Sequence, residues 1–305
     1  AFAAAEPIVL YGEQHKYKDK IVYQEQTRYQ KIVVTQWKND FWLFINGSTQ
    51  FSTYDEERYH EPLVHPLMGL IEERKDILLL GGGDGLAARE ILKYSDVENL
   101  TLVDLDPAMT RLAQQDKIFL NINQGSMNDP RISVINQDAY HYIRESDGLY
   151  DAIIIDLPDP KSVSLSLLYS LGFYKMIEKH LKPFGAMITQ STSPLYSPEA
   201  FLCIKKTMQA AGFSVLPYQN SIPSMGQWGW NLGVRRKAMS SKVLKQKAEM
   251  YKNPDIETHF FNKDAMISMV HFGKGLFEKE EKIEINTQFN HNILEYYRQG
   301  SWDLY

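Results

Sequence analysis

Five aspartates follow apolar runs of the sequence, and together they can hold a ligand that carries several positive charges. They are Asp84, Asp104, Asp138, Asp156 and Asp159. A single aspartate after a strand is often a helix N-cap, and for Asp138 that interpretation is equally open. The carboxyl ends of parallel strands form the ligand-binding edge of a sheet, so five acids along one edge predict an acidic crevice.

Asp156 is the acid best placed for proton transfer, since it ends the apolar strand expected over Asp151–Ile155. A primary ammonium with a pKa of about 10.4 is mostly protonated at about pH 7.4, so freeing its lone pair costs about 4 kcal/mol. A carboxylate beside the amine can take that proton, and Asp159 can hold a second ammonium as a fixed counter-charge. Chemistry of this kind requires no metal ion and no covalent intermediate.

A glycine-rich turn is expected to position a ligand near these acids. The apolar run Ile77 to Leu80 predicts a strand buried on both faces, which leads through Gly81, Gly83 and Gly85 into a helical pattern. Glycines at alternate positions let the backbone approach a ligand at a helix N-terminus. Asp104 ends the next apolar run and can accept both ribose hydroxyls. A glycine turn with an incidental acid is the alternative, but strand, turn, helix and acid in register favour a nucleoside site.

Strand–helix alternation continues beyond this turn and predicts an α/β fold with a Rossmann-like, methyltransferase-type, mostly parallel sheet. Residues 20–53 instead predict a small N-terminal antiparallel β-domain, in which Asn46-Gly47 is a two-residue hairpin turn. We expect three parts: an N-terminal β-hairpin domain over residues 1–66, a Rossmann-like domain over residues 67–235 and a C-terminal helical extension over residues 236–305.

The segment between the two domains is expected to be helical from Tyr54 and to break near Pro62 and Pro66. His60 and His65 are five residues apart, which places them on different faces of a helix, so the zinc-protease spacing is not met. We therefore expect no metal site here, and histidines that are structural or line a cleft.

Composition excludes several classes of protein. The chain has 305 residues, a net charge of -5 and one cysteine, Cys203. The negative charge argues against nucleic acid as a partner, and one cysteine excludes an internal disulfide and a cysteine metal cluster. No apolar run of the sequence approaches membrane-spanning length. Because the sequence begins with Ala1 rather than methionine, we expect it to be part of something longer.

Over about residues 20–235 the chain resembles the spermidine synthases, the polyamine aminopropyltransferases. The resemblance rests on Gly81-Gly-Gly-Asp-Gly85, Asp104, Gln137-Asp138 and Asp156-Leu-Pro-Asp-Pro160, with Tyr29-Gln30, Tyr59-His60-Glu61, Gln190 and Ile222-Pro-Ser224 as further matches.

The resemblance implies decarboxylated S-adenosylmethionine as co-substrate and no other cofactor. Asp104 would hold its ribose, Asp138 its adenine amino group, and Gln30 with Asp84 its aminopropyl ammonium. The implied donor-binding residues are Gln30, Gly81, Gly83, Asp84, Asp104 and Asp138.

The resemblance further implies that a neutral diamine attacks the carbon next to the sulfonium, with putrescine giving spermidine and methylthioadenosine. Asp156 would be the catalytic carboxylate, and Tyr59 would help to orient the amine. The implied acceptor-binding residues are Tyr59, His60, Asp159, Gln190 and Trp228. Trp228 and Trp230 offer flat apolar walls for a methylene chain, although both also fit the core of a closing strand.

Two departures from the family pattern concern the donor and acceptor ends. The family usually has Glu where Asp104 stands, and its usual Tyr-Pro beside the acceptor is replaced by Pro223-Ser-Met-Gly-Gln-Trp228. This segment and the tail Asn290 to Trp302 resemble the bacterial branch in which the synthase domain follows a bundle of membrane helices. We therefore expect a cytoplasmic location, either free or as the cytosolic domain of a membrane-anchored protein, and a homodimer.

Two other functions are compatible with the same motifs. A methyltransferase would use intact S-adenosylmethionine on a polyamine, but its carboxylate would meet Asp84, and two like charges at close range repel. A non-catalytic polyamine sensor would bind without turnover, and intact Asp156, Asp159 and Tyr59 argue against it.

Overall fold

The computed structural model describes residues 14–252 and 255–304, and the chain folds as two compact units. One unit ends at Glu56 and the other begins at Glu57, so we describe each by itself. The boundary expected at residue 66 falls inside helix α2 (Glu57–Leu70). The division into three parts stays a prediction, because the C-terminal extension is not separated from the rest of the second unit.

The first unit contains a four-stranded antiparallel sheet in the order β1-β2-β3-β4. Its strands are β1 (Lys20–Gln26), β2 (Lys31–Trp37), β3 (Asp40–Ile45) and β4 (Ser48–Ser52). Asn46 and Gly47 form the predicted two-residue turn, since both have positive φ (50° and 80°) and the flanking Ile45 and Ser48 pair directly. The small antiparallel sheet expected from the sequence is therefore confirmed.

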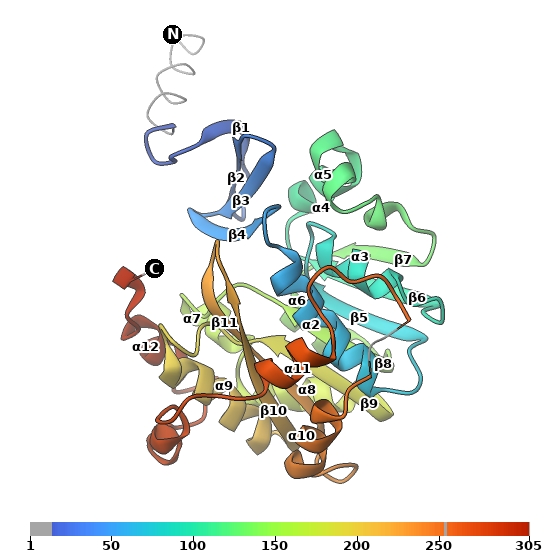
Figure 1. Ribbon diagram of the computed structural model, residues 1–305, viewed down its shortest axis with the longest axis vertical. Coiled ribbons are helices and arrows are strands. Elements are labelled where there is room, and N and C mark those ends of the chain that lie inside the picture. The colour runs from blue at the N-terminus through green and yellow to red at the C-terminus, as the bar shows by residue number, and fades with distance from the viewer. Residues whose placement is uncertain (1–13, 253–254, 305) are drawn as a thin grey trace. The chain divides into compact units, whose positions relative to one another are not determined.

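The second unit is built on a seven-stranded sheet in the order β10-β11-β9-β8-β5-β6-β7 (Figure 1). Strands β9, β8, β5, β6 and β7 are parallel, whereas β11 and β10 run antiparallel at one edge. This mostly parallel sheet confirms the predicted fold class. The strands are β5 (Asp76–Gly81), β6 (Asn99–Asp104), β7 (Ile132–Asn136), β8 (Tyr150–Asp156), β9 (Leu181–Gln190), β10 (Phe213–Ile222) and β11 (Gly226–Arg235).

Helices cover the sheet and bury its apolar strands. Alternate residues of β5 and β8, such as Leu78 and Ile153, share one apolar cluster with helices α8 and α9. Helix α2 packs against α3 and also contacts β8, β9 and β10. The helices after α2 are α3 (Leu86–Leu92), α4 (Pro107–Gln115), α5 (Lys117–Ile122), α6 (Ala139–Glu145), α7 (Val163–Leu167), α8 (Leu171–Lys179), α9 (Pro198–Ala210), α10 (Ser241–Glu249), α11 (Lys263–Met269) and α12 (Asn292–Arg298).

Short 3₁₀ turns complete the second unit. They are η2 (Ser126–Asn128), η3 (Phe277–Lys282) and η4 (Trp302–Leu304). None of the helices in residues 14–252 and 255–304 combines the length and apolar character that crossing a membrane requires.

Helix α2 runs through Pro62 and Pro66, so the break expected at these residues is wrong. A proline lacks the N–H that would bond the carbonyl four residues earlier, here that of Arg58 and of Pro62. Strand β10 supplies the missing donors: Asn220 Nδ2 donates to the Arg58 carbonyl (2.8 Å), and Tyr218 Oη donates to the Pro62 carbonyl (2.7 Å). The helix therefore keeps its carbonyls bonded at both prolines.

Candidate active site

The glycine turn after β5 requires glycine because other backbone and side-chain atoms lie against it. A Cβ on Gly81 would lie 2.0 Å from the Asp156 carbonyl oxygen, and Gly81 has a φ of 83° that favours glycine. A Cβ on Gly83 would lie 2.6 Å from Asp104 Oδ2. The turn therefore brings the ends of β5, β6 and β8 together.

Asp104 stands at the end of β6, where it faces this turn. Gly83 N donates to its Oδ2 (3.1 Å), and Asp106 N donates to its Oδ1 (2.9 Å). Burial raises the pKa of Asp104 to about 6, and the charge of Asp84 acts in the same direction. A ligand hydroxyl that donates a hydrogen bond to Asp104 would stabilise the ionised form of this carboxylate.

Asp84 lies in the glycine turn itself. Its Oδ1 accepts a hydrogen bond from Leu86 N (2.8 Å), which ties the acid to the start of α3. Its negative charge raises the pKa of both Asp104 and Asp156. The structure therefore brings three of the predicted acids into one electrostatic environment.

Asp156 ends β8 and is paired with Tyr59 from the first turn of α2. The Tyr59 hydroxyl donates to Asp156 Oδ1 at 2.6 Å across 97 residues of sequence. Burial raises the pKa of Asp156 to about 6, and Asp84 raises it further. His60 and the hydrogen bond from Tyr59 oppose this shift. The result is a half-buried carboxylate that is ionised at neutral pH and gains a proton readily.

Tyr59 is held in place by aromatic neighbours. Its ring lies 5.0 Å from the ring of His60 and 5.5 Å from that of Trp230, with edge-on and tilted geometry. Burial and the charge of Asp156 raise the pKa of Tyr59 well above its ordinary value, so the phenol keeps its proton and remains a donor.

Asp159 lies three residues beyond Asp156, next to Gln190 at the end of β9. Gln190 Nε2 donates to Asp159 Oδ1 (3.4 Å), to the Leu157 carbonyl (2.7 Å) and to Tyr169 Oη (2.6 Å). Burial raises the pKa of Asp159, and the charge of Lys161 opposes the shift.

Trp228 joins this group through its indole. Its Nε1 donates to Gln190 Oε1 at 3.3 Å, and its side chain is buried. The structure therefore connects the predicted acceptor residues Asp159, Gln190 and Trp228 with one another. It separately connects Tyr59 with Asp156 and places the ring of His60 against Tyr59.

Two residues that are predicted to bind the aminopropyl donor, Asp138 and Gln30, make hydrogen bonds within the protein. Asp138 is the N-cap of α6, where its Oδ1 accepts from His141 N (2.9 Å). It follows Gln137, whose N–H donates to the Asp104 carbonyl (3.1 Å), so it lies near the end of β6. Gln30 lies in the first unit, between β1 and β2, where its N–H donates to Thr27 Oγ1 (3.0 Å). Their roles toward a donor stay predictions.

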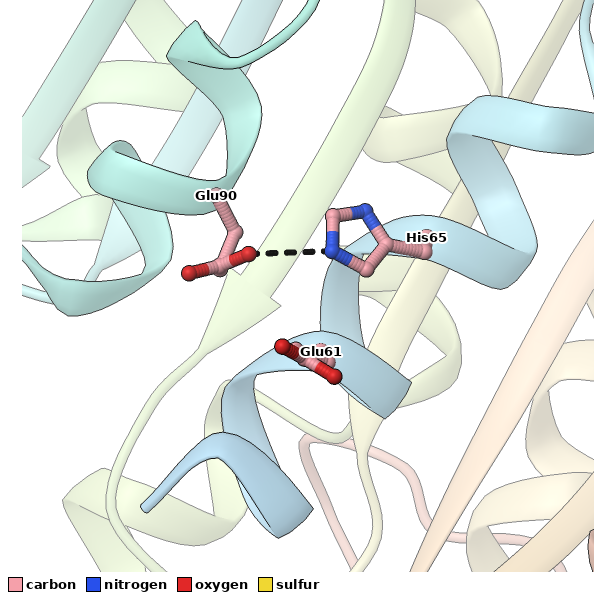
Figure 2. A group of neighbouring side chains, drawn as sticks. All are labelled: Glu61, His65 and Glu90. Atoms are coloured by element: carbon pink, nitrogen blue, oxygen red, sulfur yellow. Dashed lines mark hydrogen bonds and ion pairs between the residues drawn. The ribbon is translucent and has the colours of Figure 1, made fainter. Parts of the chain in front are cut away.

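A second polar cluster joins α2 to α3, and its three members are close enough to hold a metal ion. Figure 2 shows Glu61, His65 and Glu90, whose nearest ligand atoms all lie within 4.8 Å of one another. Glu90 already has three donors, because His65 Nε2 (3.0 Å), Arg89 Nε (2.9 Å) and Lys93 Nζ (2.7 Å) surround it. Burial raises the pKa of Glu90, but these partners outweigh it and lower the value to about 2.

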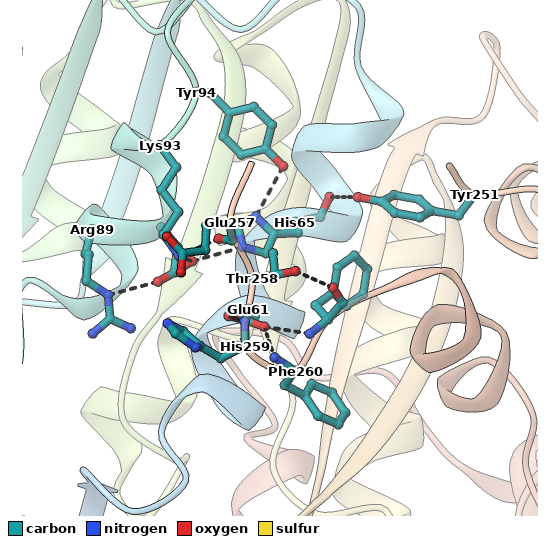
Figure 3. Close-up of polar contacts among 12 residues, drawn as sticks. Glu61, His65, Arg89, Lys93, Tyr94, Tyr251, Glu257, Thr258, His259 and Phe260 are labelled. Carbon is teal, nitrogen blue, oxygen red and sulfur yellow. Dashed lines mark hydrogen bonds and ion pairs between the residues drawn. The ribbon is translucent and has the colours of Figure 1, made fainter. Parts of the chain in front are cut away.

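Both carboxylate oxygens of Glu61 likewise accept hydrogen bonds. Its carboxylate accepts the backbone N–H groups of His259 (2.6 Å), Phe260 (2.8 Å) and Phe261 (2.6 Å), as Figure 3 shows. Lys93 Nζ also donates to the Glu257 carbonyl (3.0 Å). This charge-balanced network fastens residues 257–261 to α2 and α3, and we interpret it as structural rather than metal-binding.

Two residues that the sequence did not single out also belong to the site. The Tyr297 hydroxyl donates to Asp159 Oδ2 (3.0 Å) from α12. Thr192 is buried with a φ of 56°, which costs a β-branched residue about 1–3 kcal/mol. Its N–H donates to Gln190 Oε1 (2.9 Å), so the strained turn also fixes the Gln190 side chain. The resemblance includes the tail Asn290 to Trp302, which contains Tyr297, but no spacing or motif in the sequence indicates the contacts that these two residues make.

Comparisons with known proteins show which sequences and structures resemble this chain. The chain is 38% identical over 295 residues to a polyamine aminopropyltransferase of Oceanobacillus iheyensis, which covers 96% of this chain and 56% of that protein. It is 38% identical over 296 residues to a polyamine aminopropyltransferase of Leptospira interrogans, which covers 97% of this chain and 57% of that protein. The chain thus spans about half the length of these curated relatives.

Two solved structures share the fold. The spermidine synthase of Thermotoga maritima superposes with a TM-score of 0.74 at 24% identity, covering 86% of this chain and 88% of that chain. A spermidine synthase in complex with the transition state analogue AdoDATO gives a TM-score of 0.76 at 23% identity, covering 86% and 89%. The family model for the spermine/spermidine synthase domain matches residues 56–247, more than half of the sequence, and the chain therefore belongs to that family.

Proposed function

We propose that this protein transfers an aminopropyl group from decarboxylated S-adenosylmethionine to a small diamine. Putrescine is the acceptor that we expect, with spermidine and methylthioadenosine as products. The observation that carries the proposal is the pairing of Tyr59 with Asp156, at 2.6 Å, near the charge of Asp84 in the glycine turn after β5. The names of the relatives support the same reaction class.

The donor half of the proposal assigns the glycine turn and Asp104 to the nucleoside. Gly83 lets the backbone lie against Asp104, so a ribose held by this carboxylate would also lie along the turn. Asp84 would face the aminopropyl ammonium. An intact methionine would bring a carboxylate to the same place, where two like charges repel in a partly desolvated site.

The chemical step needs one proton acceptor. The neutral amine nitrogen attacks the propyl carbon bonded to sulfur, the carbon–sulfur bond breaks, and its electron pair stays on sulfur as a neutral thioether. The nitrogen is neutral when it attacks because its ammonium first gives one proton to Asp156, and the product amine keeps the positive charge that the sulfonium loses. Tyr59 donates to Oδ1 and fixes the carboxylate, so we assign the proton to Oδ2.

Asp159 would bind the distal ammonium of the diamine, while Gln190 and Trp228 border the methylene chain. Holding both ends of the diamine converts the attack into an oriented, effectively unimolecular step. The homodimer expected from the family resemblance belongs to the same proposal.

Product analysis tests this function. We would incubate the protein with putrescine and either decarboxylated or intact S-adenosylmethionine, and identify products by chromatography and mass spectrometry. Spermidine and methylthioadenosine in the first arm are expected. A methylated putrescine in the second arm would indicate a methyltransferase, and binding without any product would indicate a polyamine sensor.

A further inference from the structure

Helix α12 (Asn292–Arg298) reaches the candidate active site from the C-terminal end of the chain. The hydroxyl of its Tyr297 donates to Asp159 Oδ2 at 3.0 Å, across 138 residues of sequence. Tyr297 is buried, and it lies outside the residues 56–247 that the family model matches. This contact therefore comes from a part of the chain that lies beyond the matched family domain.

The chain around Tyr297 is fastened to the loop that follows β9. Ser301 N donates to the Tyr196 carbonyl (2.7 Å), and Ser197 Oγ donates to the Tyr296 carbonyl (3.2 Å). The Trp302 ring lies 4.5 Å from the ring of Tyr297, and its Nε1 donates to the Tyr297 carbonyl (2.7 Å). These contacts hold the phenol in one orientation before any ligand arrives.

The hydrogen bond from Tyr297 helps to fix the orientation of the Asp159 carboxylate. Gln190 donates to one carboxylate oxygen and Tyr297 to the other, so the plane of the carboxylate is fixed from both sides. Burial raises the pKa of Asp159, whereas the charge of Lys161 and then the hydrogen bonds from Tyr297 and Gln190 lower it. A carboxylate has about four acceptor positions, so the donors Gln190, Tyr297 and Thr192 still leave capacity for an ammonium.

We propose that Tyr297 is a positioning residue that makes the site select amines with a second ammonium. The proposal rests on the proposed function, since it assigns Asp159 to the distal end of a diamine. Tyr297 acts through Asp159: its hydrogen bond holds the carboxylate in a fixed orientation, and an amine without a distal ammonium gains nothing from that orientation. The C-terminal segment therefore contributes to acceptor specificity.

The test compares a diamine with a monoamine of the same chain length. We would measure kcat/KM for putrescine and for n-butylamine in the wild type, Tyr297→Phe and Tyr296→Phe. Tyr296 is a matched control on the same helix, because its hydroxyl accepts from Glu284 N (3.2 Å) rather than contacting Asp159.

Tyr297→Phe is expected to lower the ratio of putrescine to n-butylamine kcat/KM about tenfold, through a higher KM for putrescine. Tyr296→Phe should leave that ratio within about twofold of the wild type. In Asp159→Asn the further change Tyr297→Phe should have little effect, because the two residues act as one unit. An unchanged ratio in Tyr297→Phe, or an equal loss for both amines, would overturn the proposal.

Calorimetric binding of putrescine and n-butylamine separates this inference from the proposed function. If the wild type binds putrescine in preference to n-butylamine and Tyr297→Phe removes the preference, the positioning role stands even where no product forms. If the wild type shows no preference for putrescine in binding or turnover, the positioning role is refuted. Aminopropyl transfer to either amine would then still support the proposed function.

Discussion

Replacing Asp156 by asparagine is expected to stabilise the folded protein while it stops catalysis. Asparagine has nearly the same shape, and its Oδ1 can still accept the hydrogen bond from Tyr59. It has no charge to desolvate and cannot accept a proton from the amine. The same substitution should therefore move stability and turnover in opposite directions.

The pKa of Asp156 gives the size of the stability effect. It is raised from 3.8 to about 6, so between these values the unfolded chain has released its proton while the folded protein keeps it. The free energy of unfolding consequently falls as pH rises through this window and stays lower above it. A shift of about two pKa units corresponds to a destabilisation of the folded protein by about 3 kcal/mol. Because Asp156 is only half-buried and solvent screens its charge, we expect a destabilisation of about 1–2 kcal/mol.

Urea unfolding at pH 8 and pH 4 would measure this effect, beside turnover at pH 8. At the higher pH, Asp156→Asn should unfold with a free energy about 1–2 kcal/mol above that of the wild type, and at the lower pH the difference should shrink. Its turnover should fall at least about a hundredfold. Asp147→Asn, at an exposed acid outside the site, is the control and should change neither quantity. A destabilised Asp156→Asn would show that Asp156 is not a destabilising buried charge, and turnover within about threefold of the wild type would show that it is not the catalytic base.

Three further predictions concern the donor, the pH profile and α2. Decarboxylated S-adenosylmethionine should raise the melting temperature more than the intact form does, and Asp84→Asn should narrow that gap in thermal-shift measurements; equal shifts in the wild type would favour the methyltransferase. The logarithm of kcat/KM should rise with pH and level off above about pH 6, because Asp156 must lose its proton to act as a base, and an unchanged rate down to pH 5 would contradict this. Tyr218→Phe should lower the free energy of unfolding in urea by about 1–3 kcal/mol, since it leaves the Pro62 carbonyl buried without its donor, and a neutral effect would mean that this hydrogen bond does not stabilise α2.

The sequence predicted the features that depend on local pattern. The apolar run Ile77 to Leu80 lies in β5, and Asp104 and Asp156 end β6 and β8 as expected. These predictions succeed because a strand buried on both faces has no polar alternation and its carboxyl end is a fixed place in the sheet. The fold class follows from the same repetition of strands and helices.

Features that depend on distant partners could not be predicted in this way. Helix α2 contains two prolines, and a local pattern indicates a break there; the donors from Tyr218 and Asn220 that compensate for them come from β10, more than 150 residues later. The contact between Tyr297 and Asp159 likewise joins residues 138 positions apart. A tail with little periodicity gives no signal that one of its tyrosines meets a buried acid.

The most direct test of aminopropyl transfer lets both donors compete in one reaction. We would mix the protein with putrescine, decarboxylated S-adenosylmethionine labelled in its aminopropyl group and intact S-adenosylmethionine labelled in its methyl group, and determine by mass spectrometry which label reaches the amine. We expect the aminopropyl label to appear in spermidine and the methyl label to appear on no amine. Transfer of the methyl label, with none of the aminopropyl label, would contradict it.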